Sequence, residues 1–233
     1  MYSILAILFI SVHLLHASED GRCVMRGECG IDDLTFLPKP CVYNGSPTAI
    51  KTEESTKFLK EVCPGINPDS VCCDDSQVAS FEAQFSSLSA LFRRCPACIH
   101  NLANVFCQMI CSPTQSRFLT VTDSAGSGLN TTVNSIDYSI TECYANGLFN
   151  SCKNVQIAVG PQRVIEIACG AHGKDCSPFR WLEYMGTHDP SPFQINFKYN
   201  DYGMGNALIP CDKPSFFGQA CSKEDCPRGD DYD

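Results

Sequence analysis

Seventeen cysteines in a chain of 233 residues constrain this fold more than any other feature of the sequence. Whether the cysteines form disulfides depends on the compartment in which the protein folds. The chain begins with an almost wholly apolar run over residues 4–15, followed by small residues near Ala17 and Ser18. Such a run has the length of a signal-peptide core and is short for a bilayer span. We therefore predict a signal peptide over residues 1–18, one domain over 19–228 and an acidic tail over 229–233. In an oxidising compartment the cysteines form disulfides.

Four of the cysteines lie close together in residues 94–113, RCPACIHNLANVFCQMICSP. Cys95 and Cys98 have the spacing of zinc ligands, and Cys107 and Cys111 could complete such a site. A redox pair is a second alternative, but the surrounding pattern is not the βαβ arrangement typical of thioredoxin-like proteins. The predicted secretion signal and the many other cysteines favour structural disulfides, each worth about 2–4 kcal/mol. Because the count is odd, at least one thiol is unpaired or bridges two molecules.

The remaining pattern predicts one α+β domain with helices earlier and short strands later. The Gly-, Pro- and Cys-rich residues 21–52 favour loop and short strand. Helices are predicted over residues 53–62, to about residue 92 after Asp74 or Asp75 as N-cap, over 96–111 after Cys95 as cap, and over 134–153. After Asn154 the chain is predicted to be extended, and alternation over residues 192–197 indicates a half-buried strand. No later segment approaches about 18 uninterrupted apolar residues, so we expect the mature chain to be soluble.

The net charge and the short sequence motifs exclude some classes of binding partner and indicate the cellular route of the protein. A net charge of −9 argues against nucleic acid and against an anionic membrane surface as partners. Asn44 and Asn130 each begin an Asn-x-Ser/Thr glycosylation motif, which agrees with the secretory route.

The sequence offers little for catalysis. It contains no G-x-S-x-G or H-E-x-x-H motif, so we expect no catalytic residues, no metal and no cofactor. His100, His172 and His188 are interpreted as solvent-exposed, and Cys143 as a small buried residue on a helix. Taken alone, the segment from Trp181 through Glu183, Tyr184 and Met185 is interpreted as core packing rather than a binding wall. Gln77, in a first helical turn, is by default solvated or capping.

Several motifs together resemble a known family. They are CVMRGECGI (23–31), VCPG (62–65), VCCD (71–74), the four-cysteine segment and WLEYM (181–185). In order and spacing they are similar to the lumenal N-terminal domain of the Niemann–Pick type C sterol transporters, the large membrane member of that pair, over residues 21–226. The resemblance implies a helical body, a small mixed β-sheet and a buried pocket for one cholesterol molecule. It also implies the disulfides Cys23–Cys72, Cys29–Cys41, Cys63–Cys107, Cys73–Cys111, Cys95–Cys221, Cys98–Cys152, Cys169–Cys176 and Cys211–Cys226, with Cys143 unpaired.

The same resemblance assigns the sterol site. Gln77 matches the family's hydroxyl-binding glutamine, and Glu28 matches a carboxylate near that end. Glu183 and Tyr184 match residues near the inner wall, whereas Ile167 and Ala168 match an apolar pair at the pocket mouth used in sterol transfer. The pocket-lining positions are Met25, Phe81, Phe106, Pro192, Phe193 and Ile195.

Two departures from the family bear on this assignment. Pro40 replaces an asparagine that is a second hydroxyl partner, so one hydrogen bond worth about 0.5–1.5 kcal/mol is lost. Burial of the sterol rings outweighs that loss, at roughly 0.8 kcal/mol per CH₂ equivalent, so weaker or broader binding is expected. His172 and Lys174 replace acidic residues, so a soluble lumenal carrier, the second Niemann–Pick type C protein, would meet a different charge pattern.

The leading hypothesis is therefore non-catalytic binding of one sterol in the secretory and endolysosomal lumen, or at the cell exterior for an uptake-type or secreted form. A folate- or riboflavin-receptor-like domain is an alternative, although such domains stack their ligands on several tryptophans and this chain has one. A secreted hydrolase is a third. Family members continue into transmembrane helices, so the chain is either a fragment of such a protein or a free-standing homologue. The choice between the lysosomal and the intestinal-uptake branch stays open.

Overall fold

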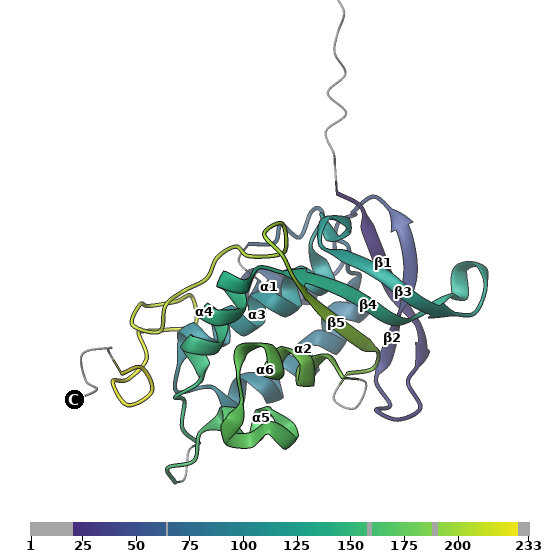
Figure 1. Ribbon diagram of the computed structural model, residues 1–233. Coiled ribbons are helices and arrows are strands. Elements are labelled where there is room, and N and C mark those ends of the chain that lie inside the picture. Colours follow the sequence, from purple (N-terminus) through teal and green to yellow (C-terminus); the bar gives the residue numbers. More distant parts are fainter. Residues whose placement is uncertain (1–20, 64, 158–159, 188–190, 228–233) are drawn as a thin grey trace, which may run out of the picture.

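A mixed β-sheet beside a helical body makes up the fold (Figure 1). The computed structural model describes residues 21–63, 65–157, 160–187 and 191–227. The predicted signal peptide, the acidic tail and His188 lie outside these residues. In chain order the elements are β1 (Cys23–Ile31), β2 (Pro38–Gly45), α1 (Glu53–Val62), α2 (Asp75–Leu91), α3 (Pro96–Cys111), the 3₁₀ turn η1 (Gln115–Arg117), β3 (Leu119–Ala125), η2 (Gly128–Asn130), β4 (Thr132–Ile140), α4 (Glu142–Cys152), α5 (Val164–Ala168), η3 (Gly170–Asp175), α6 (Pro178–Gly186) and β5 (Gln194–Tyr199).

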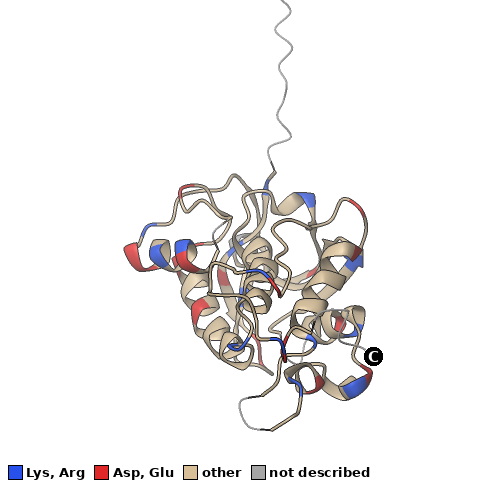
Figure 2. Cartoon of the chain, turned by 90° about the vertical axis from the view of Figure 1, so that its left-hand side faces the viewer, with Lys and Arg blue, Asp and Glu red and all other residues tan. Residues whose placement is uncertain are grey.

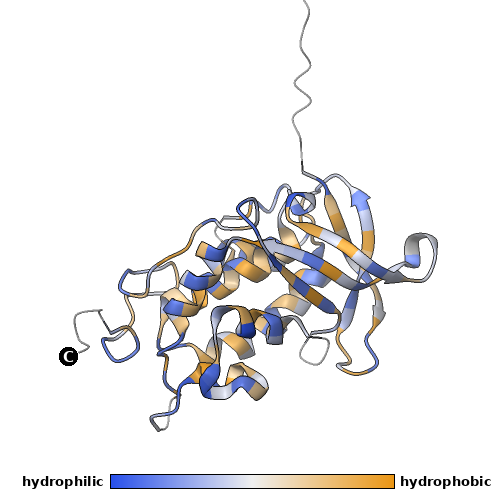
Figure 3. Ribbon diagram, in the orientation of Figure 1, coloured by the Kyte–Doolittle hydropathy of each residue, from blue (hydrophilic) through white to orange (hydrophobic). Residues whose placement is uncertain are grey.

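The sheet has the order β1-β2-β4-β3, and β5 adds to β4. The β1–β2, β2–β4 and β3–β4 pairs are antiparallel, whereas β4 and β5 are parallel. Figure 3 shows apolar residues along the helices and on the strands beside them. The expected α+β class, mixed sheet and single domain are confirmed.

Local sequence signals set the helix bounds. Thr52 caps α1 by accepting a hydrogen bond from the Ser55 amide, and Asp74 caps α2. Pro96 occupies the first turn of α3, where its missing N–H costs nothing. All three helices lie close to where the pattern predicts them. No helix of the described residues has the length and hydrophobicity needed to cross a bilayer.

The predicted helix over residues 134–153 is wrong in its first half, which forms β4. Ile136 and Ile140 are both fully buried and lie four residues apart. Residues four apart lie on the same face of a helix, and they also lie on the same face of a strand, where side chains alternate. The spacing of this buried pair therefore does not distinguish a helix from a strand. Thr141 then caps α4, which is the real start of the helix.

The order of elements also differs from the prediction. Strands β1 and β2 lie in residues 21–52, where loop and short strand were predicted. Two further helices, α5 and α6, follow Asn154 where an extended chain was predicted. Ser177 accepts a hydrogen bond from the Arg180 amide, and Pro178 begins α6. This Ser-Pro start is a helix signal that the Cys-rich surroundings obscured.

Eight disulfides join the same residue pairs that the resemblance implies. Cys143 is the free cysteine, and it is exposed, so its interpretation as a buried side chain was wrong. The inward face of α4 carries Tyr144, Ala145 and Leu148 instead.

The exposure of individual side chains tests the predictions for His100 and for the two glycosylation motifs. His100 was expected in solvent but is only 7% exposed, because α3 is buried on almost every side. Asn44 and Asn130 are both exposed, as glycosylation acceptors must be. Acidic and basic residues are interspersed over the face in Figure 2.

Candidate functional site: an apolar cavity between the helices and the sheet

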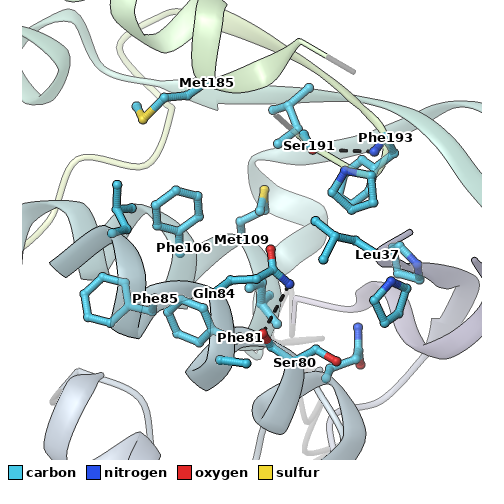
Figure 4. Close-up of a pocket in the computed structure, with 18 of the residues that line it drawn as sticks. Leu37, Ser80, Phe81, Gln84, Phe85, Phe106, Met109, Met185, Ser191 and Phe193 are labelled. Carbon is cyan, nitrogen blue, oxygen red and sulfur yellow. Dashed lines mark hydrogen bonds between the residues drawn. The ribbon is translucent and has the colours of Figure 1, made fainter. Parts of the chain in front are cut away.

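A cavity of about 750 Å³ lies between α2 and α3 on one side and the β1–β2 hairpin, α6 and β5 on the other. It opens to solvent at one side rather than being sealed. Its volume falls within the range of about 300–1,000 Å³ that is usual for small-molecule sites. Most of its wall is apolar, and Figure 4 shows aromatic and sulfur-containing side chains from several elements pointing into it.

Gln77 is the most constrained polar group of the wall. It is 8% exposed, and its side-chain oxygen accepts hydrogen bonds from the amides of Gly27 at 2.7 Å and Asp74 at 3.2 Å. Asp74 in turn accepts from the Gln77 amide at 3.0 Å, which completes a capping box at the start of α2. Two backbone donors therefore fix which way the side-chain amide points. No described residue accepts a hydrogen bond from its nitrogen, so two N–H groups remain for a ligand.

Gly27 makes this arrangement possible. Its φ of +76° places it in the left-handed region, and the β1–β2 register shifts between Met25 and Glu28. This irregularity turns the Gly27 amide toward Gln77 instead of into the strand ladder. The polar part of the cavity thus depends on a glycine that carries no side chain.

Glu28 and Ser80 form a second polar pair in the wall. The Ser80 hydroxyl donates to a Glu28 carboxylate oxygen at 2.7 Å. Glu28 and Pro40 are cross-strand partners, and both line the cavity. Pro38 and Pro40 supply neither a side-chain donor nor a backbone N–H, so this side of the polar region is apolar.

An aromatic cluster forms the helical wall. The ring of Phe81 lies 5.5 Å from that of Phe58, 5.4 Å from Phe85 and 6.2 Å from Phe106, centre to centre. Phe81, Phe85 and Phe106 all line the cavity, together with Met25 and Met109. The opposite wall is supplied by Ala168, Trp181, Tyr184, Met185, Pro192, Phe193 and Ile195.

The expected site residues are mostly brought together, with two exceptions. Gln77, Glu28, Met25, Phe81, Phe106, Tyr184, Pro192, Phe193, Ile195 and Ala168 all line the cavity. Glu183 does not: it is exposed on the other side of α6, because Trp181, Tyr184 and Met185 share the cavity face at helical spacing. Burial of the phenol, with a smaller contribution from the negative charge of Glu183, raises the pKa of Tyr199 to about 12. Ile167 does not line the cavity either and lies beside Ala168 with 56% of its surface exposed. His172 and Lys174 are exposed in η3.

Part of the wall was not predicted from the sequence. Helix α2 presents a second stripe at three- and four-residue spacing, formed by Ser80, Gln84, Ser87 and Leu91. The small and polar residues of this stripe give no periodic signal, because apolar periodicity marks only the core-facing stripe of a helix. Leu37 and Trp181 were also missed, and Trp181 was interpreted as packing alone. The Asp-x-x-Gln spacing of the capping box was visible in the sequence.

The sequence of the chain is similar to known proteins over nearly its whole length. The chain matches the family model described as the Niemann-Pick C1 N terminus over residues 20–229. It belongs to that family. It is 31% identical to the NPC intracellular cholesterol transporter 1 of Sus scrofa, over 97% of this chain and 18% of that protein. It is 30% identical to homolog 1b of that transporter from Drosophila melanogaster, over 94% of this chain and 20% of that protein. The human NPC1-like intracellular cholesterol transporter 1 is 29% identical, over 82% of this chain and 15% of that protein. The chain therefore spans a fifth or less of these relatives.

Proposed function

We propose that this chain binds one sterol molecule, cholesterol or a close relative, in the apolar cavity and holds it for transfer without chemical change. The single observation that carries the proposal is a cavity of about 750 Å³ whose apolar walls surround a few fixed polar groups. A sterol has a large apolar body and one hydroxyl, and such a cavity complements both parts. The family and the names of the relatives, which are cholesterol transporters, support the same ligand class.

Each part of the wall has a defined role in this proposal. The Gln77 amide donates a hydrogen bond to the sterol oxygen, and Glu28 lies nearby. Burial of the rings against Met25, Phe81 and Phe106, and against Tyr184, Pro192, Phe193 and Ile195 opposite, supplies most of the affinity. At about 25 cal/mol per Å² of apolar surface, this burial exceeds the contribution of one neutral hydrogen bond several-fold.

The proposed setting is the lumen of the secretory and endolysosomal route, which the eight disulfides support. Ile167 and Ala168, beside the opening, are the proposed points of sterol transfer. A soluble lumenal sterol carrier, the second Niemann–Pick type C protein, is the proposed partner there. Exposed Lys174 would present positive charge to it, beside the exposed His172.

Binding of radiolabelled cholesterol to the purified chain tests the proposal, at neutral and at acidic pH. Phe106→Ala should lower affinity by about 10- to 100-fold, because it removes a ring from the wall. Phe118→Ala is the matched control: this ring is also half-buried and packs on Tyr138, but does not line the cavity. Unlabelled folate and riboflavin should not compete. Equal loss from both variants, or no saturable cholesterol binding, would contradict the proposal.

A further inference from the structure

The turn between β1 and β2 is built around the side chain of Asp32. The Asp32 side chain, in a residue only 4% exposed, accepts hydrogen bonds from the amides of Leu34 at 3.2 Å and Thr35 at 2.8 Å, and from the Thr35 hydroxyl at 2.9 Å. The backbone closes the same turn, because the Phe36 amide donates to the Asp32 carbonyl and the Asp32 amide to the Leu37 carbonyl, each at 2.9 Å. The turn is therefore held in one conformation by its own hydrogen bonds.

This fixed turn presents its apolar side chains outward. Ile31 is 59% exposed, Leu34 60% and Phe36 78%; we call these three residues the hairpin tip. Phe36 also has a φ of +57°, a left-handed conformation that glycine adopts freely and that costs other residues roughly 1–2 kcal/mol. A large aromatic residue thus occupies a position where glycine would relax the backbone and where the ring contacts little of the protein. Neither packing nor turn geometry accounts for it.

The hairpin tip is continuous with the cavity. Leu37, Pro38 and Pro40 follow it directly, and all three line the cavity wall. Across the opening, Leu91 lines the cavity with 53% of its surface exposed, and Ile167 lies beside the lining residue Ala168. Figure 1 shows the β1–β2 turn and α5 at the same, lower edge of the molecule. Whatever surface receives the tip therefore lies next to the cavity opening.

We propose that the hairpin tip inserts into the interfacial layer of a lipid bilayer and docks the cavity opening against the membrane. Three side chains cover far less than the roughly 1,200 Å² of a stable protein interface, whereas insertion into a bilayer needs no complementary pocket. The exposed Asp33 and the net charge of −9 oppose anionic lipid, so the partner is a zwitterionic bilayer. The identity of the ligand that would cross this opening rests on the proposed sterol site, whereas the membrane docking does not depend on it.

Sedimentation with sterol-free phosphatidylcholine vesicles tests the docking. Phe36→Gly should lower the partition coefficient about tenfold, because it removes the most exposed ring. The same variant should unfold at an equal or higher temperature than the wild type, because glycine relieves the left-handed strain. Loss of docking with retained stability separates membrane insertion from a folding defect. Tyr202→Ser is the control: Tyr202 is 92% exposed, on the turn after β5 and away from the hairpin, and its loss should not change partitioning.

A second measurement keeps the two proposals distinguishable. Phe36→Gly should bind cholesterol in detergent solution as the wild type does, but should take it up from vesicles more slowly. Equal vesicle partitioning of wild type and Phe36→Gly would overturn the docking proposal. So would self-association that depends on Phe36 without vesicle binding, since the occupant would then be a second copy of the chain. If the wild type fails to bind cholesterol in solution but still binds vesicles through Phe36, the docking stands and the sterol site is wrong.

Discussion

Gln77 combines two jobs that are usually separate. Its side-chain oxygen completes the capping box of α2 and receives the Gly27 amide, so it ties the first helix turn to β1. The nitrogen of the same amide is left for the cavity. A capping box accepts glutamate as readily as glutamine, because only the side-chain oxygen takes part. In the proposed site, the amide nitrogen is the donor that glutamine supplies and glutamate lacks.

This division of labour predicts the effect of Gln77→Glu. The carboxylate retains both acceptor bonds to the backbone, so the thermal unfolding midpoint at neutral pH should stay close to that of the wild type. The donor is lost, and cholesterol affinity should fall by about tenfold, the upper end for one neutral hydrogen bond. Calorimetric unfolding and a cholesterol binding isotherm measure the two effects. Gln77→Ala, which breaks the cap as well, should lower both stability and affinity; unchanged affinity in Gln77→Glu would remove Gln77 from the site.

The polar region also predicts relaxed head-group selection. Pro38 and Pro40 offer no donor, and the Gln77 nitrogen can only donate. A ketone oxygen accepts a hydrogen bond from it as a hydroxyl does. Cholest-4-en-3-one and cholesterol should therefore compete for the cavity with affinities within about threefold of each other. Strong rejection of the ketone would mean that Glu28 accepts the hydroxyl proton, and Glu28→Gln would then restore the ketone.

At this scale the sequence predicted residue types better than residue orientations. Phe81, Phe106 and Phe193 line the cavity as the resemblance implied. Apolar residues at these positions fit the wall of a cavity for an apolar ligand. Glu183 and Cys143 were misplaced because each is adjacent in sequence to a cavity-lining or buried tyrosine. One residue step on a helix is a rotation of about 100°, which is enough to move a side chain from wall to solvent.

Among the elements, α3 carries two functions on two faces. Phe106, Met109 and Ile110 face the cavity. On another face, Asn101 exchanges hydrogen bonds with the backbone of Ile209 at 2.8 and 2.9 Å, and Asn104 donates to the Asn206 carbonyl at 2.8 Å. His100, also buried on α3, packs edge-on against the ring of Phe217 near the C-terminal end of the chain. The sequence predicted this helix and its bounds. It did not predict the hydrogen bonds to the segment around residues 206–209, because polar residues that bind a distant loop do not recur at a regular spacing.

Burial of His100 predicts acid sensitivity of this contact. Burial lowers the pKa of His100 from its ordinary 6.5, and the hydrogen bond with Ala207 opposes that shift less strongly. Below about pH 6.5 the unfolded chain therefore takes up the proton before the folded chain does, and stability falls as the pH falls further. Thermal unfolding between pH 7.5 and 5 should show a shallower loss for His100→Gln, which keeps a donor but does not titrate in this range. Identical slopes for His100→Gln and wild type would exclude His100 as the cause.

Across the whole molecule, the cross-links are unevenly shared between the two walls of the cavity. Cys73–Cys111 joins the residue before the α2 cap to the end of α3, and Cys63–Cys107 joins the end of α1 to α3. On the opposite side the β1–β2 hairpin carries Cys23–Cys72 and Cys29–Cys41. The rest of that side, formed by α5, α6 and β5, has within the described residues only Cys169–Cys176, which closes a short local loop. Trp181 holds α6 to the body by packing against Phe92 and Phe149. The α2–α3 wall and the hairpin are therefore cross-linked, whereas α5, α6 and β5 are held to the body by non-covalent contacts.

This asymmetry predicts which wall moves when the ligand leaves. Without cholesterol, amides of α5 and α6 should exchange with solvent at least about tenfold faster than those of α3, because local opening there breaks no disulfide. With cholesterol bound, exchange in α6 should slow, since Tyr184, Met185 and Trp181 then contact the ligand, while α3 should change little. Hydrogen–deuterium exchange followed by mass spectrometry measures both segments in one experiment. Phe106→Ala, which weakens binding from the fixed wall, should abolish the ligand-dependent slowing in α6. Equal protection of α3 and α6 in the ligand-free chain would show instead that the cavity is rigid on both sides and that the ligand enters without movement of α6.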